Sequence, residues 1–399
     1  MNMKIIFFLF TAACFSQTIV STNITILPDT QISVSNNFII TSGSRVLNDG
    51  ELILKGNIIN NGVLSYTPSL TTGNLRFEGL NQDVFSENPI ILNNVLFNNN
   101  STLLNGTLQI NNDANFSSGI VNTKDFGGTV FFNELSDHLN TSHMSFVNGQ
   151  VLRSGFLDFV FPTGDADFYR PMTILNLTSL NSFSSTYFSE NSNAQFPHEN
   201  KTEIINFIDN EEYWELRRTD GLDFAVIELV RDEASSSLEI MNADLNALRI
   251  VRWDADRNFW LDEGGVVNTD NNAIRTISNV TDYGIYALAI TNEEIVSSGD
   301  LLAYNNLTPN GDGINDTFII TGIENYPDNN VKIVNRWGSV VYEVDGYNNT
   351  DIAFSGVANS GLSMSDGMLP SGTYYYVLNY TTADNQVVKK VQYLYLNGK

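Results

Sequence analysis

The stretch Asn48-Asp-Gly-Glu-Leu52 places an Asp-Gly corner between two short apolar segments. The same unit recurs loosely as Asn60-Asn-Gly-Val-Leu64 and as Leu104-Asn-Gly-Thr-Leu108. Glycine is expected at these corners because it supplies the positive φ values that tight turns require. A short strand with an Asn-Gly or Asp-Gly corner, repeated along the chain, predicts a right-handed parallel β-solenoid in which stacked coils bury each other's inward faces.

The alternation of apolar and polar residues extends this solenoid-like region over residues 17–155. Apolar residues at every second position bury one face of a strand, as at 24–27, 38–41, 51–55, 57–60, 63–66, 107–110 and 129–132. Asn-rich corners fit stacked coils, since asparagine side chains can hydrogen-bond up a ladder. The alternative is a meandering antiparallel sandwich, which uses the same turns and the same alternation. Periodicity does not reveal strand direction, so both architectures stay open.

Length and composition limit the class of protein. A chain of 399 residues predicts two or three modules, since a domain contains about 150 residues. The chain has 20 Lys and Arg against 45 Asp and Glu, a formal net charge of −25. A nucleic-acid partner is excluded, because phosphate binding needs basic side chains. Charged residues are only 16% of the chain and aromatic residues 11%, so we expect an acidic, secreted, all-β protein rather than a disordered polymer.

Residues 156–290 are predicted to form a middle β-sandwich. Short alternating segments are separated by turn residues, at 156–161, 172–177, 213–217, 224–229, 248–253, 259–261, 273–277 and 283–288. Such regular spacing is typical of sandwiches. Residues 291–300 are predicted to be a linker, because they contain the polar run Asn292-Glu-Glu-Ile-Val-Ser-Ser-Gly299.

The N-terminus has the pattern of a secretory signal peptide, residues 1–16. Lys4 precedes an apolar run at 5–15, and Ser16 is the expected cleavage position. The run is shorter than the ~20 residues of a spanning helix, and no comparable stretch follows, so the mature chain is expected to lack a transmembrane segment. An alternative is lipoprotein acylation at Cys14, although the position three residues before it is Thr11 rather than Leu or Val. Cleavage after Ser16 would leave no thiol for disulfides, catalysis or metal binding.

The C-terminal region, 301–399, contains three distinctive blocks. They are Thr308-Pro-Asn-Gly-Asp-Gly-Ile-Asn-Asp-Thr-Phe318, Val331-Lys-Ile-Val-Asn-Arg-Trp-Gly338 and Leu369-Pro-Ser-Gly-Thr-Tyr-Tyr-Tyr-Val-Leu378. Val331, Ile333 and Trp337 fall on one face of a strand, while Lys332 and Arg336 point to the other. The same alternation repeats at Tyr374, Tyr376, Leu378 and Tyr380. These elements predict a compact sandwich.

These blocks resemble the gliding-motility-associated C-terminal domain, the type B sorting domain of the type IX secretion system of Bacteroidetes. The motif positions that carry the resemblance are Pro309, Asn310, Gly311, Asp312, Gly313, Asn335, Arg336, Trp337, Gly338, Pro370, Gly372, Thr373 and Tyr374. The resemblance implies an Ig-like β-sandwich that the outer-membrane translocon recognises after Sec export. Val334 stands where the family commonly has an aromatic residue before Asn-Arg-Trp-Gly, and Phe354 where the family usually has a Trp before the Gly356 turn; both keep an apolar side chain.

The first block also has the donors of a calcium loop. Asn310, Asp312, Asn315 and Asp316 approximate the D-x-D-G-x-x-D arrangement, and hard cations require several oxygens from a short, tightly turned loop. Ile314 and the missing terminal Glu exclude an EF-hand. The alternative is that these side chains cap their own turns. Calcium is therefore the one candidate cofactor.

Catalytic signatures are missing from the sequence. It contains no Gly-x-Ser-x-Gly elbow, Walker loop or dinucleotide fingerprint. The three histidines, His138, His143 and His198, lack zinc-protease spacing and are interpreted as surface or turn residues. With 45 acidic residues, close carboxylate pairs arise by chance, among them Asp165 and Asp167 beside Arg170, Glu211 and Glu212, Asp254 and Asp256, and Asp262 and Glu263.

Aromatic residues of the middle region allow two interpretations. Tyr213, Trp214, Trp253 and Trp260 could form a platform for sugar rings or fill the core of a sandwich. The core is favoured, because alternate aromatic residues in sandwiches usually point inward.

Two functions fit these observations. The first is a secreted or cell-surface protein, adhesin-like or structural and not an enzyme, which is exported through Sec and the type IX translocon. Its ligand would be a surface glycan or a protein. The alternative is an extracellular polysaccharide-degrading enzyme with a β-helix-like domain, since paired carboxylates can hydrolyse glycosides.

Overall fold

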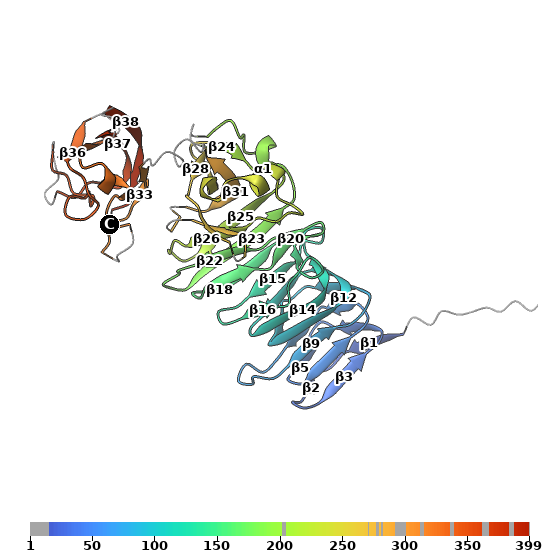
Figure 1. Cartoon of the computed structure of the whole chain (residues 1–399). Helices are drawn as coiled ribbons and strands as arrows, with labels where there is room; N and C mark the ends of the chain where they lie inside the picture. Colours follow the sequence, from blue (N-terminus) through green and yellow to red (C-terminus); the bar gives the residue numbers. More distant parts are fainter. Residues whose placement is uncertain are drawn as a thin grey trace, which may run out of the picture.

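The computed structural model describes residues 16–201, 205–269, 271–276, 279–280, 282–291, 301–311, 315–335, 339–360, 367–382 and 387–398. The structure is 53% strand and 4% helix, and it contains a β-solenoid of about 7 turns (Figure 1). The all-β fold class is therefore confirmed. Residues 1–15 of the predicted signal peptide and 292–300 of the predicted linker lie outside the described residues. In the part of the chain that is described, no helix is long and apolar enough to span a membrane.

Each coil of the solenoid contributes strands to three faces in turn. The first face contains β1 (Gln17–Val20), β4 (Asn37–Ile40), β7 (Ile58–Asn60), β10 (Asn81–Ser86), the later parts of β12 (Asn94–Asn105) and β14 (Asp113–Asn122), β17 (Val147–Asn148) and β20 (Thr163–Asp165). The second face contains β2 (Ile24–Ile26), β5 (Arg45–Asn48), β8 (Val63–Ser65), β11 (Ile90–Leu92), β13 (Thr107–Ile110), β15 (Thr129–Phe132) and β18 (Val151–Gly155). The third face contains β3 (Gln31–Val34), β6 (Glu51–Leu54), β9 (Asn74–Phe77), the first parts of β12 and β14, and β16 (Asp137–Leu139).

Strand direction decides between the two architectures that the sequence left open. Neighbouring strands on each face are parallel, with Gln17 opposite Asn37 on the first face and Gln31 opposite Glu51 on the third. These partners are about 20 residues apart, whereas Ile58 and Val84 are also partners across a longer coil. The solenoid is confirmed, and the unequal coil lengths explain why its period is irregular in the sequence.

The corner glycines have a different role from the one predicted. Positive φ is found at Gly106 but not at Gly50 or Gly62, so that prediction is wrong for two of the three copies. A Cβ atom would lie 2.5 Å from the carbonyl oxygens of Leu27 and Thr30 at Gly50, and 2.4 Å from that of Ser44 at Gly62. These corners need glycine because the backbone of the preceding coil passes too close for any side chain.

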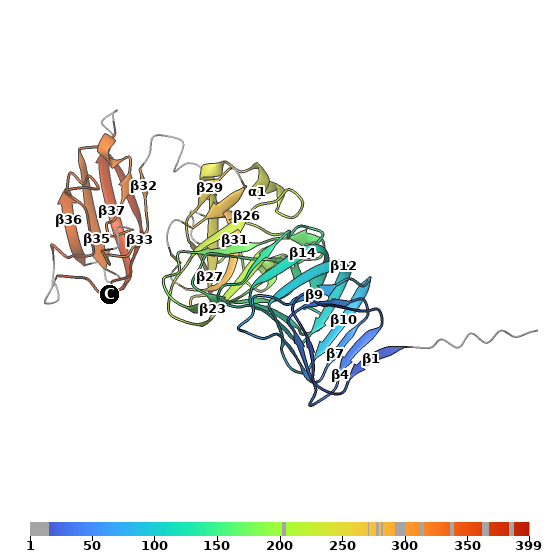
Figure 2. The same ribbon diagram turned by 90° about the horizontal axis from the view of Figure 1, so that it is seen from below.

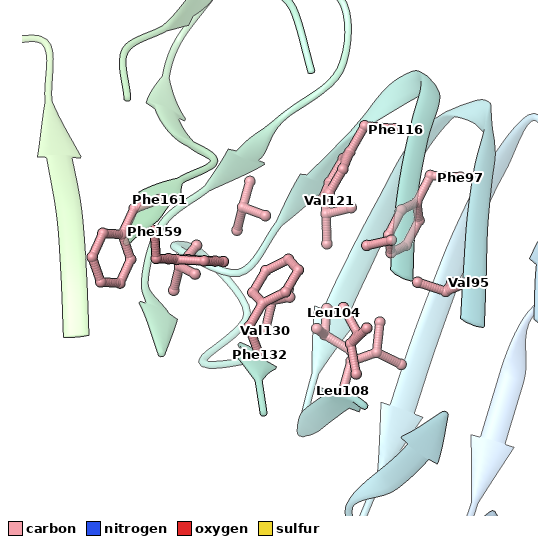
Figure 3. Close-up of a cluster of buried hydrophobic side chains, with 14 of the residues drawn as sticks. Val95, Phe97, Leu104, Leu108, Phe116, Val121, Val130, Phe132, Phe159 and Phe161 are labelled. Carbon is pink, nitrogen blue, oxygen red and sulfur yellow. The ribbon is translucent and has the colours of Figure 1, made fainter. Parts of the chain in front are cut away.

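The solenoid core is a stack of inward-facing side chains (Figure 3). The rings of Phe77 and Phe97 stack with centroids 5.3 Å apart and an interplanar angle of 7°, and Phe116 follows Phe97 at 5.1 Å. Asparagine side chains also bond between coils, as predicted: Asn112 Nδ2 donates to Asn94 Oδ1 at 2.7 Å. Identical positions in successive coils therefore repeat the same packing.

The end of the solenoid continues into the middle region without a break in the core. β18 pairs in parallel with β15 and antiparallel with β23 (Asn181–Phe188). The sheet then continues through β25 (Tyr213–Asp220), β31 (Gly284–Thr291), β27 (Leu248–Asp254) and β28 (Phe259–Asp262), with β24 (Ile205–Ile208) beside β31. One hydrophobic cluster extends from Val20 in the first coil to Leu288 in β31.

A five-stranded sheet lies beside this extension and shares its core. It contains β19 (Phe159–Phe161), β22 (Met172–Leu175), β26 (Val226–Val230), β30 (Ala273–Arg275) and β29 (Val266–Asn268). The other elements here are short: β21 (Phe168–Tyr169), η1 (Ser192–Ala194), α1 (Leu238–Asn242) and η2 (Leu245–Ala247). β18 ends at Gly155, but parallel pairing continues to β20, where Thr163 lies opposite Val147, so the boundary at residue 155 stays a prediction. The sandwich predicted for 156–290 stays a prediction.

The C-terminal region has a separate core. Its main sheet has the order β33 (Asn306–Leu307), β38 (Val387–Leu396), β37 (Gly372–Thr381), β35 (Asn329–Asn335) and β36 (Val340–Asp345). β32 (Leu302–Ala303) pairs with β34 (Ile320–Thr321), and η4 (Ile323–Asn325) follows. Figure 2 shows β36, β35, β37 and β33 of this sheet beside one another. The Ig-like topology that the resemblance implies stays a prediction.

Candidate functional site

The tyrosine-rich strand β37 forms the centre of the C-terminal sheet. Tyr374, Tyr376, Leu378 and Tyr380 point into the core and are at most 7% exposed, which confirms the predicted alternation. Val331 and Ile333 on β35 are fully buried beside them, while Lys332 points outward to Glu343, 2.8 Å away. Phe354 is also fully buried, with its ring 4.9 Å from that of Tyr342. The departures at Val334 and Phe354 leave the sheet and core intact.

Two of the predicted motif blocks meet on this sheet. Asn335, at the end of β35, lies opposite Tyr374 on β37. The Tyr374 hydroxyl donates to the Pro370 carbonyl at 2.9 Å, and Asn335 Oδ1 accepts from the Ser339 N–H at 3.0 Å. Arg336, Trp337 and Gly338 lie outside the described residues. Gly372 and Thr373 begin β37, opposite Leu396 and Tyr395.

The first motif block forms a turn closed by its own carboxylate. Asp316 Oδ1 accepts hydrogen bonds from the N–H groups of Asn310 at 2.9 Å and Gly311 at 2.7 Å. The Asn315 carbonyl accepts from the N–H of Thr308 at 2.8 Å. Pro309 packs toward Gly356, where an added Cβ would lie 3.0 Å from the proline Cγ. Asp316 therefore caps the turn, as in the alternative to calcium binding.

The structure describes part of the predicted calcium loop. Asp312 and Gly313 lie outside the described residues. Among the described residues, no cluster of three or more His, Cys, Asp or Glu side chains could hold a metal ion. Asn310, Asn315 and Asp316 contribute neutral or already bonded oxygens, so calcium at this turn stays a prediction.

The second and third motif blocks contribute neighbouring strands of one sheet, and the first block forms the turn that follows β33. Residues 301–396 match the CHU_C type IX secretion signal domain. The match includes all three motif blocks and all five strands of the main sheet, so the resemblance is confirmed. The type IX secretion signal implies export to the cell surface or beyond. No curated protein matches the chain.

The acidic pairs that the sequence analysis named lie outside the signal domain, and several of these carboxylates bind basic side chains. Arg170 does not pair with its sequence neighbours Asp165 and Asp167. It binds Glu212 through two hydrogen bonds of 2.7 and 2.6 Å, and both side chains are buried. Asp165 instead binds Lys124 at 2.7 Å. The bidentate geometry satisfies the buried charges of Arg170 and Glu212 together.

A network of buried polar groups surrounds this ion pair. The hydroxyls of Tyr187 and Ser236 donate to Glu212 at 2.9 and 2.5 Å. The Arg170 carbonyl accepts from Trp214 Nε1 at 3.1 Å. Asp209 lies beside the network, and burial together with the Glu212 charge raises the pKa of Asp209 to about 7. No member of the network is more than 7% exposed, and it connects the segments that precede β22 and β25 with β23.

The remaining acidic pairs also support the fold. Glu263 binds Arg252 at 2.7 Å, and Asp262 lies 3.9 Å from Arg249. Burial raises the pKa of both carboxyl groups. Asp254 Oδ1 accepts from the N–H of Asp256 at 3.0 Å and so caps the turn between β27 and β28. Three carboxylates of these two pairs, those of Asp254, Asp262 and Glu263, therefore have partners within the fold.

The histidines do not come together. His143 Nδ1 accepts from the Tyr169 N–H at 3.1 Å, and the His198 ring lies 2.8 Å from the Ser192 hydroxyl. His138 contradicts the prediction of a surface residue, because it points into the solenoid between Phe116 and Phe159. Its Nε2 bonds to the Val160 carbonyl at 2.7 Å, and burial lowers the pKa of its imidazole.

The aromatic residues of the middle region are core residues, as favoured by the sequence. Trp214 and Trp260 are fully buried, and Tyr213 and Trp253 are 3% and 7% exposed. They therefore form no open platform for sugars. The buried side of β27 and β28 holds Trp253 and Trp260 at 5.6 Å in a T-shaped contact.

The outward face of the solenoid is the feature that sequence reasoning missed. On the first face, Ile19, Ile39, Ile59 and Phe85 occupy equivalent positions of four successive strands. The third face differs, because Arg76 bridges Glu51 and Glu78 there. Alternation along each strand was visible in the sequence, but the alignment of outward residues depends on coil length and register.

Proposed function

We propose that the chain is a non-enzymatic cell-surface or secreted protein, adhesin-like or structural, which reaches the cell exterior through Sec and then the type IX translocon. The observation that carries the export route is the signal domain at residues 301–396. The long solenoid supports a role as a stiff stalk or binding surface, since stacked coils create extended repetitive faces.

The partners that the fold gives to the acidic residues support a role without catalysis. Glu212 and Glu263 each bind a buried arginine, and Asp254 caps a turn. A glycosidase instead requires two carboxyl groups held across an accessible groove.

The export route is tested by deleting residues 301–399 in the native host. We expect the truncated protein to accumulate in the periplasm, because the translocon no longer recognises it, while the full chain is surface-exposed or released. Protease accessibility on intact cells and fractionation measure the location. Normal surface delivery of the truncated protein would contradict the proposal.

Catalysis is tested separately with the purified full chain on a panel of polysaccharides. We expect no new reducing ends and no unsaturated products. A variant Glu212→Gln that abolished any activity found would favour the enzyme alternative, provided that its far-UV circular dichroism is unchanged.

A further inference from the structure

The first face of the solenoid carries two parallel columns of outward side chains. Figure 2 shows its strands β1, β4, β7 and β10 side by side. The aliphatic column contains Ile19, Ile39, Ile59 and Phe85, of which Ile19 is 57% and Phe85 44% exposed. The polar column lies two residues earlier in the chain at each level and contains Gln17, Asn37, Asn57 and Asp83, of which Asn57 directly precedes β7.

Hydrogen bonds between coils hold the polar column in register. Asn37 Oδ1 accepts from the Asn57 N–H at 3.3 Å, and Asn57 Oδ1 accepts from the Asp83 N–H at 3.0 Å. Asn57 Nδ2 also donates to Asp83 Oδ2 at 3.3 Å. The amides are therefore ordered before any ligand binds, which reduces the entropic cost of binding.

This face is almost uncharged in a strongly acidic protein. Asp83 is the only charged residue in β1, β4, β7 and β10, although the chain has a net charge of −25. The third face carries the cluster of Glu51, Arg76 and Glu78 at the corresponding level. A neutral, repetitive strip fits a neutral, repetitive ligand better than a nucleic acid or a charged peptide.

We propose that the two columns bind a neutral, linear, β-1,4-linked glycan chain lying along the solenoid axis. Adjacent strands are separated by about 4.8 Å, comparable to the length of one pyranose unit, so each coil would meet about one sugar. The flat C–H faces of the sugars would lie on the aliphatic column and on the Phe85 ring, as apolar surfaces do on aromatic rings. The equatorial hydroxyls would bond to the amides, which both donate and accept.

This inference rests on the proposed function, because it gives the adhesin-like surface a ligand class and a position. The test uses the purified full chain with microcrystalline cellulose and chitin as probes and polygalacturonate as the acidic comparison. We expect depletion from solution by at least one of the neutral polymers and not by polygalacturonate. Binding to polygalacturonate alone, or to none of the three, overturns the proposal.

Two variants locate the binding surface. Phe85→Ala is expected to weaken binding about ten-fold or more, equivalent to about 1.4 kcal/mol. Leu139→Ala is the matched control, since Leu139 is also 44% exposed but lies on the third face, and it should bind as the unmodified chain does. Equal effects of the two variants overturn the placement.

Further measurements distinguish glycan binding from self-association of the chain and from catalysis. Light scattering at increasing protein concentration detects self-association, and a dimer that Phe85→Ala dissociates would assign the face to a second copy and overturn the glycan proposal. If no glycan binds while surface delivery and the lack of turnover hold, the inference fails and the proposed function stands. Release of reducing ends from the probes would instead overturn the proposed function.

Discussion

The chain has two regions with separate hydrophobic cores. One region is the solenoid together with the middle sheets that continue it, and the other is the C-terminal signal domain. One cluster includes Val20 in the first coil and Leu288 in β31, while another includes Leu301 and Leu396. No residue belongs to both clusters. The export signal therefore has its own core, and we expect it to fold and unfold independently of the protein it exports.

The two regions also differ in how far apart in the sequence their paired strands lie. Solenoid strands pair with the next coil, as Gln17 does with Asn37. In the signal domain β33 pairs with β38, which joins Asn306 to Tyr395 across nearly the whole domain. Local pairing allows growth coil by coil, whereas the signal domain must bring both of its ends together before its sheet is complete.

The largest expected effect comes from breaking the buried ion pair between Arg170 and Glu212, in the region that follows the solenoid. Glu212→Ala leaves the Arg170 charge buried without a carboxylate, which should lower the free energy of unfolding of this region by about 3–5 kcal/mol. Differential scanning calorimetry of the full chain should show two unfolding transitions, one for each core. Only the larger transition, that of the solenoid and middle region, should move to a lower temperature. A shift of both transitions would contradict the independence of the two cores.

The control for this variant is a surface ion pair on β25, the strand that begins directly after Glu212. Glu215 binds Arg217, whose side chain is 66% exposed, at 2.5 Å. Glu215→Gln should change stability by less than about 1 kcal/mol, since exposed ion pairs contribute little. Equal destabilisation by both variants would show that burial of the Glu212 pair is not the cause.

A smaller effect is expected from the hydroxyl that closes the signal-domain core. Tyr347 is 1% exposed; its hydroxyl donates to the Phe318 carbonyl and accepts from the Phe354 N–H at 2.9 Å. Tyr347→Phe leaves both backbone groups unpaired in the core and should cost about 1–3 kcal/mol. Only the signal-domain transition should move, while Tyr375→Phe, on a side chain that is 42% exposed, should leave it unchanged.

The smallest expected effect is a difference between the two regions in how their stability depends on pH. All three histidines precede residue 199, and burial lowers the pKa of His138 below its usual 6.5. The folded state then binds fewer protons than the unfolded state, so the contribution of His138 to stability decreases as the pH falls below about 6.5. His138→Gln, which does not titrate there, should lose less stability between pH 7 and pH 5.

The comparison between wild type and variant cancels the other titrating groups, including Asp209, whose raised pKa acts in the opposite direction. The signal-domain transition, which has no histidine, should respond equally in both proteins. Identical pH profiles of the larger transition would show that His138 is not buried in its neutral form.

The sequence by itself determined the features that depend on neighbouring residues. Alternation and Asn-Gly corners predicted strands and coils, and three motif blocks predicted the signal domain at 301–399, of which the family match covers 301–396. These predictions succeeded because both signals are local in the sequence. Consecutive strand residues point alternately inward and outward, and a motif consists of residues close together in the chain.

Tertiary structure decided whatever depends on residues far apart in the chain. It gave Arg170 a partner 42 residues away, placed His138 inside the core, and required glycine at Gly50 because another coil passes close by. It also aligned Ile39, Ile59 and Phe85 into one column. Register and coil length control these contacts, and both result from packing summed over the whole solenoid rather than from any local pattern.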